Sequence, residues 1–347
     1  MDLTAEINEL NEQIAGLFPG YQFDLGELLG LLVQGKIADV MKILFQNMAQ
    51  MLQGELKSIA GIFITLICIG LIAALLMNLT DLFENKQIAD IGFYFVYLFL
   101  ILILLRVFET VSNTATGMLS DMLLFMKLFM PVYFMAIGAA TGVTTALLYY
   151  QLILLLIYGV EAVLASFLMP VIEVYIFLSF MNGLWSDEKL HMLIELIHRV
   201  IGYFLKLSFA VITGIGLLQT MITPVIDSVK LSAVRRGIAL IPGVGNISDS
   251  VAELVIGSAV LIKNSVGALA VLLLLLLCAI PAAKIWVFAM LLKAAAAITG
   301  IVSDRRLTGC MDRVGEGSLL VLRTLLTAMG LFLIMIAIAA MTMGRVV

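Results

Sequence analysis

Apolar stretches of membrane-spanning length fill this chain from residue 59 to its end. They are continuous and about 20 residues or longer, without the alternation of a half-buried strand. A segment that crosses a bilayer must satisfy its own backbone hydrogen bonds, which leaves only helices and closed barrels. The sequence therefore predicts an all-α, polytopic integral membrane helical bundle over residues 59–347, preceded by an N-terminal extramembrane region over residues 1–58.

The apolar pattern predicts seven or eight transmembrane helices, some of them broken or re-entrant. Residues 171–184 would form a helix only about 20 Å long, so this piece is expected to cross half of the membrane. Pro170 is expected to end the span before it, and the polar segment 112–121 to separate the second span from the third. The predicted spans are residues 59–79, 88–111, 122–142, 143–169, 200–221, 251–280, 282–302 and 318–343.

Composition and motifs argue against several functional classes. Hydrophobic residues make up 63% of the chain and charged residues 13%, and the net charge of -4 comes without a basic run, so nucleic acid is not an expected partner. The metalloprotease, dinucleotide-binding and P-loop motifs are absent from the sequence. We therefore expect neither an enzyme nor a cofactor.

The N-terminal region contains an amphipathic stretch at residues 26–57, in which apolar side chains recur at helical spacing. This pattern is typical of a helix that lies on the membrane surface, and equally of a helix packed on the bundle or on a partner protein. Residues 1–20 lack the charged and apolar regions of a signal peptide.

Basic residues in the loops predict the topology. Arg305, Arg306 and Arg313 lie in one predicted loop, and Arg235 and Arg236 in another. Two predicted crossings separate these loops, so the positive-inside rule allows both to face the cytoplasm. The same count places both termini outside.

Ionisable residues inside apolar spans are candidate functional residues, because a charge in hydrocarbon is costly. Glu161 lies deep in its span, and Lys127 or Lys206 is the expected partner by depth. The pair could hold helices together or line a polar conduit, and the sequence leaves both roles open. Side chains near span ends can instead reach the interface. The other ionisable residues in the spans are Glu173, Lys284, Lys293 and Arg323.

A second cluster has the spacing of metal ligands. His191, Glu195 and His198 would share one face of a helix. An amphipathic helix at the membrane surface also needs such a polar face, so we expect no metal site.

The segment 241–264 is the first choice for a functional region. Pro242, Gly243 and Gly245 should prevent a helix, which would then begin at Val251 behind a capping box. A break is expected near Lys263 and Asn264, and irregular backbone at membrane depth must be covered by protein or water. This segment, which includes Asp249, is therefore predicted to line the bundle interior or an oligomer interface. The alternative is a plain loop followed by one tilted helix.

The same segment carries a family resemblance. Residues 241–249 read IPGVGNISD, and residues 261–267 read LIKNSVG; together with Gly257, this pattern resembles the stage III sporulation protein AE family of endospore-forming bacteria. Similar stretches are residues 75–79, 94–105, 130–144 and 284–310. Precursors in that family usually begin with a cleavable signal sequence, and this chain departs from that pattern.

The resemblance implies a non-catalytic membrane subunit of the mother-cell half of a secretion-like channel that links mother cell and forespore. It implies a multi-pass location in the mother-cell membrane facing the forespore. The implied partners are the other membrane proteins of the stage III sporulation A operon, their ATPase, membrane lipid and possible further copies of the chain. The alternative reading is a stand-alone secondary transporter with a closed polar site near the membrane midplane.

Overall fold

The computed structural model shows an all-α chain in the part that it describes. That part comprises Leu17, Gly61, Ile64, Ile67, Cys68, Ile72 and residues 25–43, 86–141, 143–184, 189–238, 245–301 and 305–341. Of the predicted first span, residues 59–79, the structure describes only Gly61, Ile64, Ile67, Cys68 and Ile72, and residues 44–57 of the amphipathic stretch lie outside the described residues. The predicted fold class, a polytopic helical membrane protein, is confirmed.

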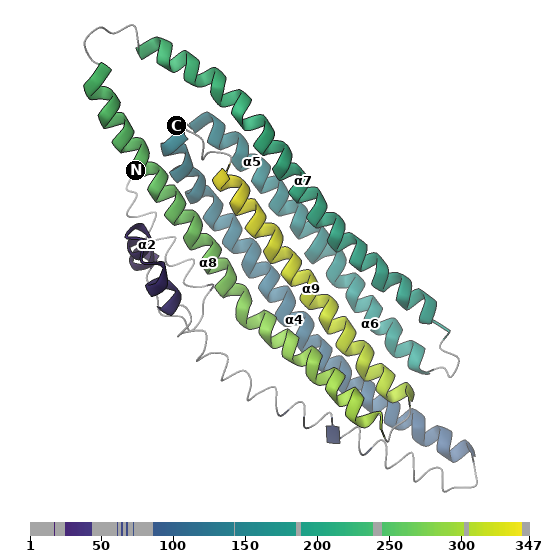
Figure 1. Ribbon diagram of the computed structural model, residues 1–347. Coiled ribbons are helices and arrows are strands. Elements are labelled where there is room, and N and C mark those ends of the chain that lie inside the picture. Colours follow the sequence, from purple (N-terminus) through teal and green to yellow (C-terminus); the bar gives the residue numbers. More distant parts are fainter. Residues whose placement is uncertain are drawn as a thin grey trace.

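Long helices run side by side along one axis, with successive helices antiparallel (Figure 1). The connection from α5 to α6 is continuous, because the π-helix η1 joins them without a turn. A short N-terminal helix, α2 (Leu25–Val33), packs against α8. The long elements are α4 (Lys86–Thr141), α5 (Val143–Val160), η1 (Glu161–Leu168), α6 (Met169–Leu184), α7 (His191–Ile238), α8 (Gly245–Thr299) and α9 (Arg305–Met341).

The described residues contain five helices that are long and apolar enough to cross a membrane, not seven or eight. Predicted spans merge because the residues expected to separate them are helical. The polar segment 112–121 lies within α4, and residues 171–184 continue α5 through η1 instead of forming a half-crossing piece. Polar side chains on the outside of a helix do not interrupt its backbone hydrogen bonds, so they are poor markers of helix ends.

Pro170 is accommodated by the π-helix that precedes it. A proline donates no backbone hydrogen bond, and its ring collides with the carbonyl four residues earlier in a regular α-helix. Here the helix widens over Glu161–Leu168, and the backbone N–H of Met169 bonds to the carbonyl of Leu164, five residues back. The wider turn allows the chain to continue as one helix, as π-bulges do elsewhere.

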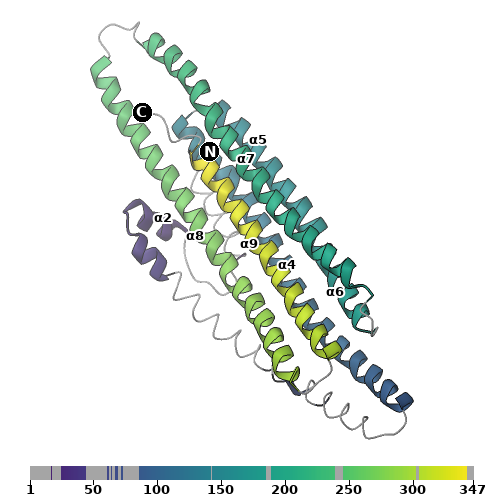
Figure 2. The ribbon, with the colours of Figure 1, turned by 45° about the vertical axis from the view of Figure 1, so that its right-hand side comes forward.

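The two basic loops lie at opposite ends of the bundle. Helix α8 alone lies between the end of α7 and the start of α9 in the sequence, and Figure 2 shows the two ends of α8 at opposite ends of the bundle. One continuous helix separates them, so Arg235 and Arg305 do not share a side, and the predicted topology is wrong on this point. The error follows from dividing α8 into two predicted spans.

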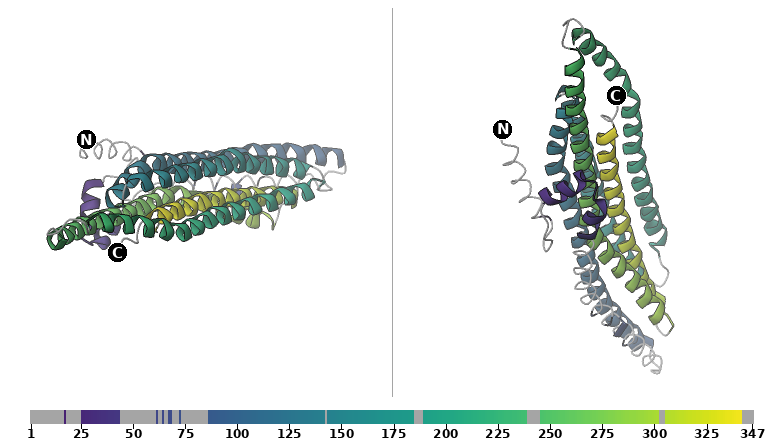
Figure 3. Two further views of the ribbon diagram at one scale, coloured as in Figure 1. Left: turned by 90° about the horizontal axis from the view of Figure 1, so that it is seen from above. Right: turned by 60° about the vertical axis from the view of Figure 1, so that its left-hand side comes forward.

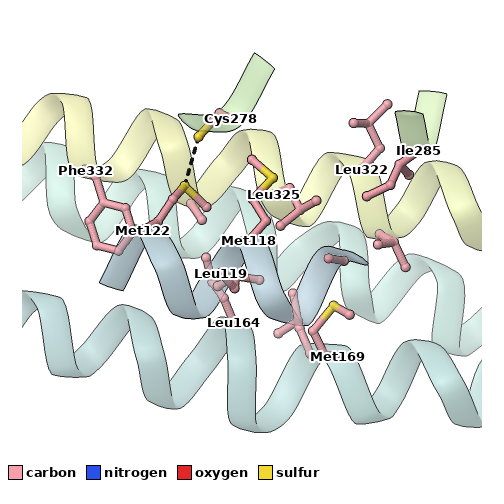
Figure 4. Close-up of a cluster of buried hydrophobic side chains, with 14 of the residues drawn as sticks. Met118, Leu119, Met122, Leu164, Met169, Cys278, Ile285, Leu322, Leu325 and Phe332 are labelled. Atoms are coloured by element: carbon pink, nitrogen blue, oxygen red, sulfur yellow. Dashed lines mark hydrogen bonds between the residues drawn. The ribbon is translucent and has the colours of Figure 1, made fainter. Parts of the chain in front are cut away.

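The helices form two layers, with α4 and α5–α6 in one and α7, α8 and α9 in the other (Figure 3). Helix α9 lies at the centre and packs against α4, α6, α7 and α8. The middle of the bundle is filled with apolar side chains (Figure 4), where the Cys278 thiol lies 3.1 Å from the sulfur of Met122. Among the buried residues there are Met118, Leu119, Leu164, Met169, Ile285, Leu322, Leu325 and Phe332.

Tyr97 joins α4 to α6 near one end of the bundle. Its ring is fully buried, and its hydroxyl donates a 2.9 Å hydrogen bond to the carbonyl of Phe180. The hydroxyl occupies the space beside Gly183 where a Cβ would otherwise lie. Gly183 is therefore required by packing, and not by backbone conformation.

Replacing Gly183 by alanine should expel the Tyr97 hydroxyl and destabilise the protein by about 1–3 kcal/mol, the usual cost of overpacking. Gly202 in α7 is the matched control, because nothing lies within 4 Å of a Cβ there. Gly202→Ala should be neutral or stabilising by up to about 1 kcal/mol. Thermal unfolding of the two purified variants measures the difference, and equal melting temperatures would contradict this role of Gly183.

Candidate functional site

Lys127 of α4 and Glu161 of η1 form an ion pair. The lysine Nζ donates to the glutamate Oε2 at 2.9 Å, and the two side chains are 31% and 37% exposed. The amine also lies 4.9 Å from the centre of the Tyr158 ring. The carboxylate and the aromatic face both stabilise the ammonium ion, which would otherwise be costly at membrane depth.

The π-helix begins at Glu161, so the ion pair and the irregular turn lie at the same point of the seam between α4 and α5–α6. Lys206, the other expected partner, lies on the exposed face of α7 and makes no ion pair with a described residue. The Lys127–Glu161 pair links α4 to η1, as the predicted role of holding helices together requires.

A second polar contact lies on the same seam. The hydroxyl of Ser112 in α4 donates a 2.9 Å hydrogen bond to Oε1 of Glu173 in α6. Ser112 is buried and Glu173 is exposed. The seam thus carries two carboxylates, each bonded to a side chain of α4.

A larger charged cluster joins α8, α9 and α7. The Lys293 amine lies 2.6 Å from a carboxylate oxygen of Glu316 and 3.2 Å from one of Asp312. On the other side of Glu316, the second oxygen lies 3.9 Å from Nε2 of His198. The His198 ring also lies 6.1 Å from the ring of Tyr175 in α6. One ammonium ion therefore holds two carboxylates at a junction where four helices meet.

Sequence reasoning missed this cluster, because it treated Lys293 as a residue near a span end. A signal was available: Asp312 and Glu316 are four residues apart, which places them on one face of a helix. The turn between α8 and α9 lies about midway between Lys293 and Asp312 in the sequence, so an antiparallel hairpin brings them together.

Two of the three residues with metal-like spacing, Glu195 and His198, contact different partners. Glu195 forms an ion pair with Arg199, one turn further along α7. His198 instead faces Glu316 of α9. Within the part of the chain that the structure describes, no group of three or more His, Cys, Asp or Glu side chains is arranged to hold a metal ion.

The expected break in α8 is not present. The helix runs without interruption from Gly245 to Thr299 and begins six residues before the predicted start at Val251. Asn264 lies exposed on its surface, so its polar group does not disturb the backbone. Gly267 is buried and permits contact with the Tyr133 hydroxyl, which makes it a packing residue. Pro242 and Gly243 lie outside the described residues, as do the side chains of Asp249 and Lys263.

An exposed polar stripe on α4 is the remaining candidate. Bulky apolar side chains are exposed along one face of α4 from Ile91 to Leu105 and again at Leu124 and Met135. Between these two zones the same face is polar. The exposed residues of this polar stripe are Arg106, Glu109, Thr110, Asn113, Thr116, Gly117 and Ser120.

The ionisable groups of the polar stripe are Arg106 and Glu109. Arg106 and Glu109 make no ion pair with any residue that the structure describes. The hydroxyls of Thr110 and Thr114, by contrast, donate to backbone carbonyls one turn earlier in α4. The two charges are therefore the groups of the stripe that no described residue pairs.

Comparisons with known proteins identify the family of the chain. The family model described as stage III sporulation protein AE matches residues 23–343. The chain belongs to this family. It is 23% identical over 253 residues to the stage III sporulation protein AE of Bacillus subtilis (strain 168). That alignment covers 73% of this chain and 63% of the relative, so it spans less than two thirds of the relative's length. No solved structure matches the chain.

In the charged cluster, the effect of Glu316→Gln on stability should depend on whether Lys293 is present. Lys293→Met leaves Asp312 and Glu316 as like charges one turn apart, which should cost about 1–2 kcal/mol, between the values for exposed and buried pairs. Glu316→Gln should destabilise the wild type but restore stability to Lys293→Met. Thermal unfolding of the four proteins measures this coupling, with Lys206→Met as the exposed control. Simple additivity of the two substitutions would contradict the cluster.

The seam pair makes a second prediction. Glu161→Gln keeps an oxygen that can accept a hydrogen bond from Lys127, whereas Lys127→Met leaves the carboxylate without a cation. The lysine substitution should therefore be the more destabilising of the two, by about 1 kcal/mol. Melting temperatures in the same detergent provide the comparison, and a larger loss in Glu161→Gln would refute this view of the pair.

Proposed function

We propose that this sporulation membrane protein is a non-catalytic subunit of the mother-cell side of a secretion-like channel that links mother cell and forespore. Its location would be the mother-cell membrane facing the forespore. Its partners would be the other membrane proteins of the stage III sporulation A operon and their ATPase. The family supplies the link to sporulation, and the surface of α4 supports a role within an assembly.

The exposed face of α4 does not match a single bilayer. Its exposed apolar side chains extend from Ile91 to Met135. This distance is about 66 Å along a helix, and still about 50 Å along the membrane normal at a tilt of 40°. A hydrocarbon core is only about 30 Å thick.

Wherever α4 lies in the membrane, part of its exposed face must therefore be shielded from lipid or from water. If the polar stripe lies in the hydrocarbon, Arg106 and Glu109 must be shielded from lipid. If the stripe lies at the interface, one of the flanking apolar zones projects out of the bilayer and exposes a large apolar surface to water. Contact with another protein satisfies both cases. The observation that carries the proposal is therefore the exposed face of α4, which is too long and too polar at its centre for a single bilayer.

The centre of the bundle favours a subunit over a stand-alone transporter. A secondary transporter is expected to gather polar groups around a site near the midplane. Here most of the described buried side chains in the middle of the bundle are apolar (Figure 4), and the buried hydroxyls of Ser318 and Thr324 donate to carbonyls of their own helix. The charged clusters lie at helix contacts that are partly exposed.

Purification from sporulating cells tests the proposal. Tagged chain extracted in mild detergent should co-purify with several other membrane proteins and an ATPase in fixed ratios. Phe95→Glu and Met135→Glu place a charge in the two apolar zones, and at least one of them should lose these partners while the chain remains inserted. Recovery of the wild-type chain alone, with solute transport in liposomes, would contradict the proposal and favour the transporter.

A further inference from the structure

The polar stripe of α4 carries opposite charges on one helix face. Arg106 and Glu109 are three residues apart, so both project from the same side of α4. Neither has an ion-pair partner among the described residues, although Lys127, Glu161 and Glu173 of the adjacent seam are all bonded. A surface with equal and opposite unpaired charges is complementary to a copy of itself.

The stripe also permits a close approach of another helix. A Cβ added at Gly117 would have open space around it, with no atom within 4 Å. The neighbouring exposed residues, Asn113, Thr116 and Ser120, have short polar side chains. Helices in membranes associate through small residues that allow their backbones to approach, and through amide and hydroxyl groups that bond across the contact.

We propose that the polar stripe of α4 is the contact between two copies of this chain. Copies inserted in the same orientation are related by an axis along the membrane normal, so their α4 helices are parallel. In this arrangement Arg106 of each copy can reach Glu109 of the other, because the two residues differ in height by only about 4.5 Å. Asn113 then lies near the axis, one helical turn from Gly117, and faces its own counterpart in the other copy. This contact does not depend on the channel role.

A second copy accounts for the stripe better than the other possible neighbours. Lipid acyl chains offer no hydrogen bonds to a charged side chain. Water would solvate the charges but gives no reason for the run of small and short polar residues, Asn113, Thr116, Gly117 and Ser120, between two bulky apolar zones. A different protein could match the stripe, but a copy of the chain supplies both charges in the required order without any further assumption.

Cysteine cross-linking in native membranes tests the contact. Cys68 is exposed and is first replaced by serine, whereas Cys278 and Cys310 are buried and remain. Asn113→Cys in this background should form a disulfide-linked dimer of the full chain under mild oxidation. Lys206→Cys, on the exposed face of α7, is the control and should remain monomeric.

Exchanging the charges of Arg106 and Glu109 between two copies of the chain tests the contact most sharply. Arg106→Glu alone and Glu109→Arg alone each place like charges across the contact, and each should lower dimer cross-linking through Asn113→Cys by about fivefold or more. When the two variants are co-expressed with different tags, one copy carries two acidic residues and the other two basic residues. Cross-linking between the two tags should then return to the wild-type level.

Three results would overturn the proposal: no Asn113→Cys dimer from chain that is inserted and thermally stable, an adduct with another protein, or equal cross-linking in all charge variants. Co-purification with other sporulation proteins but without self-contact would reject only this inference. Self-contact without such partners would support this inference and reject the proposed function.

Discussion

The hydrocarbon core of the membrane provides no hydrogen-bond partner for a backbone amide, and this constraint determines the architecture. It explains why the described chain continues as helix through residues that commonly end helices in water. Pro170 follows the π-helix η1 and lies in the first turn of α6 without ending the helix, and Pro131 and Pro281 lie inside α4 and α8. Long helices result, and the polar side chains must find partners between helices or outside the bundle.

The same constraint explains how the helices are held together. Helix association in a membrane gains little from the hydrophobic effect, so close packing and polar contacts between helices matter more. At the contacts of α9, Gly315 and Gly317 leave room for side chains of Lys293 and Ile176. The Lys293 cluster lies at this same junction. Arg106 and Glu109 of the polar stripe differ from the Lys293 cluster, because no described residue forms an ion pair with them.

The sequence predicts the helical membrane class because that depends only on apolar run length. It also identifies Lys127 as one of two possible partners of Glu161, since an ionisable residue deep in a span needs one. It fails on helix ends, because the polar segment 112–121 and Asn264 lie inside continuous helices and do not interrupt them. The Lys293 cluster and the α4 stripe depend on which helices are neighbours and which faces remain exposed, and apolar run length contains neither.

The central claim is that the exposed polar residues of α4 do not face lipid. Spin labels at Leu102, Asn113 and Leu124, which share one face of α4, test it most directly in native membranes. Collision with dissolved oxygen reports contact with acyl chains. The account predicts low oxygen accessibility at Asn113 and high accessibility at one or both flanking positions. Accessibility at Asn113 as high as at a lipid-facing flank would contradict it.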